Sequence, residues 1–311
     1  MKALNHKIVN VASVPMWSPF RYPGGKTWLV PTVRQWLRSK EHKPSIFVEP
    51  FAGGGIIALT VAFEKLANQV LMVELDDEIS AVWKVILGGG GEWLANEIRN
   101  FDFNRDSVNE VLNSDDASLE SKAFKTILKN RVYHGGIIAP GSGMIKNGEN
   151  GKGIASRWYP NTLNKRILSI HHIRDQIRFV QGDGLEIIRE YEGNSSACFF
   201  IDPPYTASKK RAGARLYKYF ELDHDLLFSY VSRIKGDFLM TYDNAVEIEN
   251  LACQHDLLVR KIKMKNTHHA EMDELLISSG FSWLCDINRQ KDCDISISIK
   301  PLSTPEQRPD F

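Results

Sequence analysis

Apolar runs of strand length recur along the chain and alternate with helical patterns. The segments SIFVEPF (45–51) and QVLMVEL (69–75) are near-continuously apolar, and a glycine-rich turn and the apolar helical stretch 56–67 separate them. Three later runs have the same character: IRFVQGD (177–183), ACFFI (197–201) and GDFLMTYDN (236–244). Strands buried on both faces and joined by helical crossovers are typical of parallel sheets, so this alternation predicts an α/β fold with a mostly parallel sheet.

The last two predicted strands break the parallel pattern. LLVRKIKMK (257–265) and MDELLISSG (272–280) are joined by the short polar segment NTHHAE, which indicates a hairpin. We therefore expect an antiparallel strand at one end of the sheet. The tail 288–311 contains the alternating run ISISI, which is compatible with an edge strand, and its polar end is expected to be disordered.

The region 88–176 interrupts the alternation of strands and helices. It contains helical patterns at 92–101 and 121–133, followed by a loop rich in glycine and lysine at 135–153. An interruption of this length is typical of an inserted subdomain or binding loop and not of a linker. The sequence is therefore divided into a core made of 1–87 and 177–287, an inserted, largely helical subdomain at 88–176, and a tail at 288–311.

Composition is that of an ordinary globular protein. The 311 residues are 43% hydrophobic and 25% charged, and no apolar run approaches the roughly 20 residues that span a bilayer. The first residues lack the apolar core of a signal peptide, so we expect a cytoplasmic protein. The four cysteines form no CxxC pair, which argues against a zinc site or disulfides and predicts free buried thiols. The pairs His171–His172 and His268–His269 lack metal-ligand spacing, so no metal is expected.

The turn after the first predicted strand has the features of a nucleotide-binding turn. Phe51 and Ala52 precede three glycines, whose freedom to adopt positive φ lets a ligand approach the backbone at a helix N-terminus. We expect an adenosine-containing cofactor here, close to Gly53 and Gly55. Glu74 follows about 20 residues later, where such folds place an acid on the ribose hydroxyls.

The identity of this cofactor is open from the turn alone. Gly53, Gly55 and Ala58, with Glu74 downstream, also fit the loose dinucleotide fingerprint. Glu49 and a proline stand directly before the turn, however, and a carboxylate at that place would repel a pyrophosphate. An aminoacyl cofactor carries an ammonium group instead, which Glu49 could face.

The tetrapeptide that follows ACFFI is suited to binding a planar amine. It consists of Asp202, Pro203, Pro204 and Tyr205. Prolines fix φ and lack an N–H, so a carbonyl beside them projects from a stiff turn as an acceptor. Asp202 and this carbonyl can both accept hydrogen bonds from an exocyclic amino group, and Tyr205 offers a ring for a base to stack on. Because the carboxyl ends of parallel strands share one edge, cofactor and amine would meet there.

Taken together, these motifs resemble those of the DNA adenine methyltransferases, which transfer the methyl group of S-adenosylmethionine to N6 of adenine. The resemblance spans 20–278 and rests on an ordered set: RYPGGK (21–26), VEPFAGGG (48–55), Glu74, Asp183, DPPY (202–205) and EMDELLIS (271–278). It implies the Rossmann-like sheet of class I methyltransferases. It also places the target-recognition region between the glycine motif and DPPY, in the interruption at 88–176.

The resemblance implies S-adenosylmethionine as the cofactor and assigns contacts to residues of the shared motifs: Tyr22, Lys26, Glu49, Phe51, Gly53, Gly55, Glu74, Asp183 and Asp202. Lys26 would pair with the cofactor's carboxylate, and Asp183 would accept a hydrogen bond from N6 of its adenine. Without the family, Lys26 would be read as an exposed lysine in a turn.

For the target base, the resemblance implies three catalytic groups. Asp202 and the Pro203 carbonyl would hold the amine, and Tyr205 would stack on the base. The implied reaction is a direct in-line displacement without a covalent enzyme intermediate, so that catalysis comes mainly from positioning and electrostatics. A duplex buries this amine, and the adenine must therefore be flipped out of the stack.

Double-stranded DNA is the expected partner. The net charge is only +1, so a DNA site must be a local patch. We expect DNA contacts from basic residues in the insertion and directly after DPPY, namely Lys146, Arg157, Lys209, Lys210, Arg211 and Arg215. The sequence leaves open the recognition sequence, the presence of a companion restriction endonuclease, and the choice between a monomer and a weak dimer.

Three other interpretations are open at this point. A methyltransferase could act on cytosine N4, on RNA adenine or on a glutamine amide, although such relatives tend to have Ser or Asn at the place of Asp202. A dinucleotide-dependent oxidoreductase would explain the glycine turn and Glu74 but would leave 21–26 and 202–205 without a task. A non-catalytic DNA-binding module would have no need of Asp202 or Tyr205.

Overall fold

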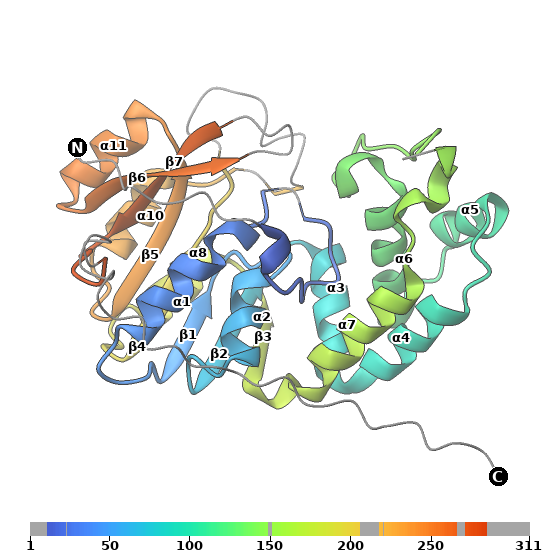
Figure 1. Cartoon of the computed structure of the whole chain (residues 1–311), viewed down its shortest axis with the longest axis horizontal. Coiled ribbons are helices and arrows are strands. Elements are labelled where there is room, and N and C mark those ends of the chain that lie inside the picture. The colour runs from blue at the N-terminus through green and yellow to red at the C-terminus, as the bar shows by residue number, and fades with distance from the viewer. Residues whose placement is uncertain are drawn as a thin grey trace, which may run out of the picture.

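A seven-stranded sheet flanked by helices forms the centre of the protein (Figure 1). The computed structural model describes residues 11–22, 24–148, 151–205, 218–219, 221–265 and 271–284. The strands are β1 Ile46–Glu49, β2 Gln69–Glu74, β3 Ile177–Gln181, β4 Ala197–Ile201, β5 Asp237–Asp243, β6 Leu258–Lys265 and β7 Glu271–Ser278. Each coincides with a segment that the sequence predicts to be a strand, so the expected α/β fold is confirmed.

The strands follow the order β3-β2-β1-β4-β5-β7-β6, in which β1 to β5 are parallel. β7 runs antiparallel to both β5 and β6. The single antiparallel strand of this sheet therefore lies inside it, and the expectation of an antiparallel strand at the end is corrected. The reason is burial: Leu275, Leu276 and Ile277 of β7 are fully buried, whereas β6 carries four basic residues, which suit an edge strand.

Alternate residues of each strand enter one of two apolar layers. In β4, Cys198 and Phe200 belong to one layer, and Phe199 and Ile201 belong to the other. The first layer contains α1 Val30–Arg38, α2 Ile56–Phe63 and α3 Asp77–Val85. The second contains α8 Gly184–Tyr191, α10 His224–Val231 and α11 Val246–Gln254. Because both faces are covered, the parallel strands are apolar at nearly every position.

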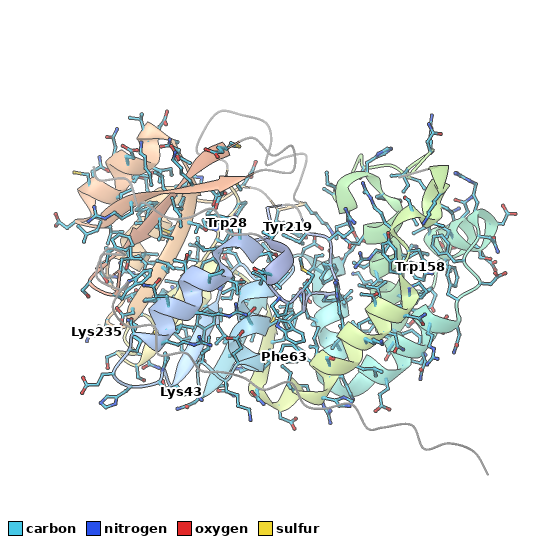
Figure 2. The ribbon with its side chains drawn as sticks, in the orientation of Figure 1. Trp28, Lys43, Phe63, Trp158, Tyr219 and Lys235 are labelled. Carbon is cyan, nitrogen blue, oxygen red and sulfur yellow. The ribbon has the colours of Figure 1, made fainter. Side chains whose placement is uncertain are left out.

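The helices of the region 88–176 lie beside the sheet in Figure 1: α4 Gly91–Asn100, α5 Arg105–Asn113, α6 Leu119–Val132 and α7 Pro160–His172. α4 packs against α7, and α6 packs against α3. The apolar faces of α4, α6 and α7 belong to the same core cluster as α1 to α3. A smaller cluster around Val108, Leu128 and Ile154 lies beneath α5 and α6, next to Trp158 (Figure 2). The region is thus attached to the sheet by a continuous apolar core.

Short helical turns connect these elements: η1 Val11–Ser13, η2 Thr27–Leu29, η3 Ile86–Gly90, η4 His134–Gly136, η6 Gly153–Arg157 and η7 Arg174–Gln176. The π-helical turn η3 joins α3 to α4 and so begins the inserted helices. In the part of the chain that the structure describes, none of the helices has the length and apolar character needed to cross a membrane. The predicted tail 288–311 lies outside the described residues.

Candidate active site

The site lies at the carboxyl edge of the sheet, where the strand order changes direction. β1 and β4 are neighbours, although β2 and β3 separate them along the chain. Glu49 ends β1 and Asp202 directly follows β4, so both carboxylates lie at the edge where open α/β sheets bind ligands. A cavity of about 1410 Å³ opens here, with walls from the ends of the strands and from helices α6 and α7.

The glycine turn between β1 and α2 has the backbone conformation that the sequence predicts. Gly53 and Gly55 have φ values of +48° and +63°, which side chains rarely tolerate. A Cβ at Gly53 would lie 2.5 Å from the ring of Tyr22, and one at Gly54 would lie 2.8 Å from Tyr22 Cβ. The close approach that these glycines allow is therefore made by Tyr22, which also lines the cavity. Trp83 of α3 secures the turn by donating from Nε1 to the Gly53 carbonyl at 2.9 Å.

Glu74, at the end of β2, connects this strand to the glycine turn. Its Oε2 accepts from the Gly53 N–H and its Oε1 from the Asp76 N–H, each at 2.8 Å. Burial raises the pKa of Glu74 to about 7, against the lowering effect of these hydrogen bonds. The residue lines the cavity, where its remaining lone pairs can accept from hydroxyl groups. Its contact with a ribose stays a prediction.

Three further predicted cofactor residues border the same cavity: Glu49, Phe51 and Asp183. Glu49 is only 4% exposed, and its Oε2 accepts from the Ala58 N–H at 2.8 Å, so it holds the first turn of α2. Burial raises the pKa of Glu49 well above its usual range. Asp183 caps α8, because its Oδ1 accepts from the Leu185 N–H at 2.8 Å. Both acids therefore combine a structural hydrogen bond with a place on the cavity wall.

Asp202 is the centre of a converging set of donors. The Tyr205 hydroxyl and the Thr241 hydroxyl each donate to Asp202 Oδ1 at 2.8 Å, and Lys26 Nζ lies 3.0 Å from the same oxygen. All three contacts fall on Oδ1, and Asp202 lines the cavity. Sequence reasoning missed Thr241. A polar residue inside the apolar strand β5 is the sequence feature that could have indicated it. Ile201 pairs with Met240, so Thr241, the next residue of β5, lies beside Asp202.

The ring of Tyr205 lies against another aromatic residue. It stacks on Tyr242 of β5 with a centroid distance of 5.6 Å and an interplanar angle of 24°. Burial, and then the charges of Asp202 and Glu274, raise the pKa of Tyr205 well above its usual range. Asp202 and Pro204 line the cavity, whereas Tyr205 and the buried Pro203, which the structure also describes, do not. The predicted roles of Pro203 and Tyr205 towards a base stay predictions.

Lys26 is buried, whereas the turn alone would suggest an exposed lysine. Its side chain is 4% exposed, and Nζ donates to the Gly24 carbonyl at 2.9 Å. The ammonium lies 4.9 Å from the centroid of the Tyr205 ring and 4.0 Å from Glu274 Oε2. Three of its contacts, with Asp202, Tyr205 and Glu274, thus place the ammonium beside DPPY. The predicted pairing of Lys26 with a cofactor carboxylate stays a prediction.

The wall formed by the inserted helices is basic. Arg131 of α6 donates to the Pro19 carbonyl, and Arg166 of α7 donates to the Ser18 carbonyl at 3.0 Å. Burial, and then neighbouring arginines that include Arg166 and Arg157, lower the pKa of Arg131 to about 9. Both Arg131 and Arg166 line the cavity. Arg131 was missed by sequence reasoning, because no local pattern distinguishes it from other basic residues of a helix.

The residues predicted to contact DNA are only partly described. Lys146 is exposed and is absent from the cavity wall, whereas Arg157 is half-buried beside Arg131. Lys209, Lys210, Arg211 and Arg215 lie outside the described residues. Two exposed tyrosines border the cavity, Tyr159 at the start of α7 and Tyr219 on the side that faces the inserted helices (Figure 2).

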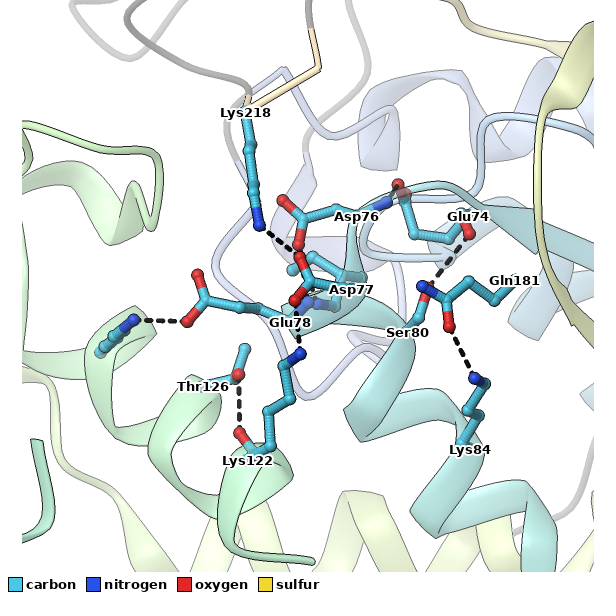
Figure 3. A network of polar contacts seen from close by, with 12 residues as sticks. Glu74, Asp76, Asp77, Glu78, Ser80, Lys84, Lys122, Thr126, Gln181 and Lys218 are labelled. Carbon is cyan, nitrogen blue, oxygen red and sulfur yellow. Dashed lines mark hydrogen bonds and ion pairs between the residues drawn. The ribbon is translucent and has the colours of Figure 1, made fainter. Parts of the chain in front are cut away.

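A charged network at the start of α3 joins three parts of the chain (Figure 3). Asp77 accepts from Lys122 of α6 and from Lys218, which follows DPPY in the chain and borders the cavity. Although burial acts in the opposite direction, these hydrogen bonds lower the pKa of Asp77 to about 2. Asp76 caps the same helix by accepting from the Glu78 N–H at 2.8 Å. The N-terminus of α3 thus connects the cavity to the inserted helices.

The described residues also bear on metal binding and on the state of the cysteines. Across the described ranges no group of three His, Cys, Asp or Glu side chains is placed to hold a metal ion. Cys198 is buried, and burial raises its pKa to about 12. Cys253 is exposed on α11, so the expectation of buried thiols is wrong for this residue. Cys285, Cys293 and the pair His268–His269 lie outside the described residues.

The charge distribution of the cavity fits S-adenosylmethionine better than a dinucleotide. The sheet side carries the carboxyl groups of Glu49, Glu74, Asp183 and Asp202. When ionised, acids at this place attract the ammonium and sulfonium groups of an aminoacyl cofactor, and they can accept hydrogen bonds from ribose and adenine. They would repel a pyrophosphate. The glycine turn and its amides lie at the same wall, at the start of α2.

Several methyltransferases are among the solved structures to which this chain is similar. An rRNA methyltransferase from Streptomyces viridochromogenes has 11% sequence identity, covers 89% of this chain and 97% of its own, and has a TM-score of 0.40. A putative RNA methyltransferase from Pyrococcus horikoshii has 11% identity, covers 86% and 92% of the two chains, and has a TM-score of 0.37. A methyltransferase from Geobacter sulfurreducens has 13% identity, coverages of 83% and 80%, and a TM-score of 0.36.

No curated protein matches the sequence. A family model does match it, over residues 22–266, which contain the glycine turn, Glu74, Asp183, the inserted helices and DPPY. This match covers most of the chain and most of the residues that line the cavity. The chain belongs to the D12 class N6 adenine-specific DNA methyltransferase family.

Proposed function

We propose that the protein transfers the methyl group of S-adenosylmethionine to N6 of an adenine flipped out of duplex DNA. Membership of the family makes it a methyltransferase that uses S-adenosylmethionine. The observation that carries the finer proposal is the environment of Asp202, whose described contacts all fall on Oδ1 at the wall of the cavity. Its second oxygen is then the acceptor for the target amine.

The amine needs such an acceptor because its lone pair is delocalised into the purine ring. Hydrogen bonds from the amine to Asp202 and to the Pro203 carbonyl would draw its two N–H bonds out of the ring plane and localise the lone pair on nitrogen. When bound, the cofactor supplies a methyl group activated by a sulfonium. No covalent enzyme intermediate is needed, so the rate depends on how firmly Asp202 is held.

The cofactor would be held by the acidic wall. We assign Glu74 to its ribose hydroxyls and Asp183 to its adenine amine, while Tyr22 and Phe51 contact it beside the glycine turn. Glu49 suits its ammonium group when ionised. Burial raises the pKa of Glu49, and a bound ammonium group would lower it again by offsetting the cost of burying the charged carboxylate.

Duplex DNA would lie against the basic wall. We propose that residues 88–176 form the target-recognition region and that Arg131 and Arg166 neutralise phosphates, since both line the cavity opposite the acids. Flipping the adenine costs a few kcal/mol, and stacking on aromatic rings, worth about 1 to 3 kcal/mol per base, offsets part of it. Tyr205 is the proposed platform, supported from behind by Tyr242.

A direct experiment tests this function. The protein is incubated with radiolabelled S-adenosylmethionine and either plasmid DNA or total RNA, and the digested nucleosides are separated by mass. We expect N6-methyladenine in DNA. N4-methylcytosine, or label in RNA alone, would contradict the proposal and support the corresponding related activity.

Asp202→Asn is the matched control, because it keeps the shape of the side chain and removes its charge. We expect this variant to bind the cofactor, as measured by calorimetry, and to lose methyl transfer. Sequencing a plasmid that was propagated with the wild-type gene would then identify the recognition sequence from the positions of modified adenine. Full activity of the Asp202→Asn variant would contradict the role given to this carboxylate.

A further inference from the structure

Glu274 is a buried acid close to Asp202 and Lys26, and the proposed reaction assigns it no role. It lies on β7, opposite Asp243 of β5 and Ile262 of β6, and its side chain is 13% exposed. Its Oε2 is buried and receives no hydrogen bond from the described residues. Among the described residues, the Lys26 ammonium lies 4.0 Å from this oxygen.

Four ionisable groups surround Glu274. Lys26 approaches from the N-terminal segment, Asp202 and Tyr205 from the end of β4, and Asp243 from β5. On β6 the opposite residue, Ile262, is apolar. The lysines beside it alternate with Ile262 along the strand: Lys261 pairs with Glu249 of α11 at 2.9 Å, and Lys263 is exposed and lines the cavity. Lys26 is therefore the one cation among the described groups that face Glu274.

Lys26 is shared unevenly between two carboxylates. Its Nζ lies 3.0 Å from Asp202 Oδ1 and 4.0 Å from Glu274 Oε2, and the ammonium also lies over the ring of Tyr205. A base that stacks on Tyr205 competes with Lys26 for the face of this ring. Its amine, bound to the second oxygen of Asp202, competes with Lys26 for the negative charge of the same carboxylate. The ammonium would need to move only about one ångström closer to the buried Glu274 Oε2 to form a full ion pair with it.

Moving Lys26 away from Asp202 would stabilise the charge that develops on the reacting nitrogen. As the new N–C bond forms, the target nitrogen becomes positively charged, and it later loses a proton to solvent. Asp202 stabilises this charge best when no ammonium neutralises it. We propose that Glu274 is a positioning residue that takes over Lys26 when the target amine binds Asp202, and so leaves the Asp202 carboxylate to the charge on the amine.

The inference rests on the proposed function, and a pH profile tests it. Single-turnover methyl transfer is measured with saturating cofactor and cognate duplex between about pH 5.5 and about 9, so that titration of Glu74, which affects cofactor binding, does not limit the rate. We expect the wild-type rate to rise as Glu274 ionises. In Glu274→Gln the rise should be lost, and the rate above neutral pH should fall about ten-fold, the order expected for removing one nearby charge.

Glu271→Gln is the matched control, since it makes the same change on the same strand at an exposed position. We expect it to keep the wild-type profile. If Glu274→Gln retains the rise with pH, or if its rate falls by the same factor at every pH, Glu274 is only structural and the inference is overturned. A wild-type protein that methylates no duplex DNA at any pH would instead overturn the proposed function.

A second measurement does not depend on activity. In protein with ¹³C-labelled glutamate, the carboxyl signal of Glu274 is identified by its absence from Glu274→Gln. We expect it to titrate near its raised pKa of about 7 in the free protein, a value caused mainly by burial. In the complex with cognate DNA its pKa should fall by about one unit or more, because Lys26 has moved closer. An unchanged pKa in the complex would overturn the exchange of Lys26.

Discussion

The three donors on Asp202 Oδ1 come from distant parts of the chain. Lys26 belongs to the N-terminal segment, Tyr205 to DPPY itself and Thr241 to β5. Lys26 and Tyr205 also contact other groups of the site, so replacing either would change several interactions at once. Thr241 is fully buried and makes a single defined contact with the carboxylate, which makes it the clearest probe of how Asp202 is oriented.

Replacing Thr241 with valine keeps the shape of the side chain and removes only the hydroxyl. We expect the methyl-transfer rate to fall about ten-fold, because a hydrogen bond to a charged group is worth about 1.5 to 3 kcal/mol and part of it orients the carboxylate. Cofactor affinity, measured by calorimetry, should not change. Thr126→Val is the control, since its hydroxyl only donates to the Lys122 carbonyl within α6. Equal rates for the two variants would show that Thr241 does not position Asp202.

Helix α6 contacts the N-terminal segment directly. Asn130, near its end, is 1% exposed. Its Oδ1 accepts from the Arg21 N–H at 2.9 Å, and its Nδ2 donates to the carbonyls of Arg21 at 3.0 Å and Gly136 at 2.7 Å. The adjacent residue of that segment is Tyr22, whose ring covers the glycine turn. The inserted helices therefore help to form the cofactor wall.

Replacing Asn130 with alanine should loosen this connection. One buried backbone group, the Gly136 carbonyl, and two partly buried groups of Arg21 lose their partner, at a cost of about 1 to 3 kcal/mol for each group that stays unsatisfied. We expect the free energy of unfolding to fall by about 2 to 4 kcal/mol in denaturant titrations. Affinity for S-adenosylmethionine should fall several-fold, because Tyr22 is held less firmly.

Asn161→Ala is the control for this change, because Asn161 is exposed on α7. We expect it to alter the free energy of unfolding by less than about 0.5 kcal/mol. If Asn130→Ala lowers stability and leaves cofactor affinity at the wild-type value, α6 supports the fold without shaping the cofactor wall.

Across the entire protein, the buried carboxylates make stability depend on pH. Burial raises the pKa of Glu74 and of Glu274 from 4.5 to about 7. The folded state therefore binds their protons more tightly than the unfolded state, and stability falls as pH rises from about 4.5 to about 7. Asp77 has the opposite effect in a separate range: its pKa is lowered from 3.8 to about 2, so its stabilising contribution is lost only as pH falls below about 4.

Glu274→Gln should consequently be more stable than the wild type at neutral and alkaline pH. The gain should be near zero at about pH 4.5 and grow to at most about 3 kcal/mol above pH 7, from a shift of about 2.5 units at 1.36 kcal/mol each. Denaturant titrations of both proteins across this range measure the difference directly. A gain that does not vary with pH would mean that Glu274 is not titrating with a raised pKa.

The same variant is expected to lose activity, so stability and function would change in opposite directions at one residue. A buried, ionised acid is costly to the fold, and the proposed role of Glu274 would offset this cost through its effect on the reaction. Residues with purely structural tasks, such as Asn130, should lose stability and function together.

The predictions that succeeded were those based on neighbouring residues. The strands were identified because a sheet covered on both faces requires apolar residues at every position, as in ACFFI, and the turn because Gly53 and Gly55 have positive φ. The place of β7 was predicted wrongly, because the pairing of a hairpin with a distant strand depends on which strand is better buried. Arg131 and Thr241 belong to no local motif.

The sequence alone thus specified the parallel sheet, the glycine turn, and the acid, prolines and tyrosine that follow β4. The packing of remote segments decided the rest. It placed Tyr22 against the glycines, gave Lys26 to Asp202 and Glu274, and set Thr241 level with Asp202. Local sequence controls backbone conformation and periodicity, whereas the charge and orientation of a buried group depend on neighbours that only folding brings together.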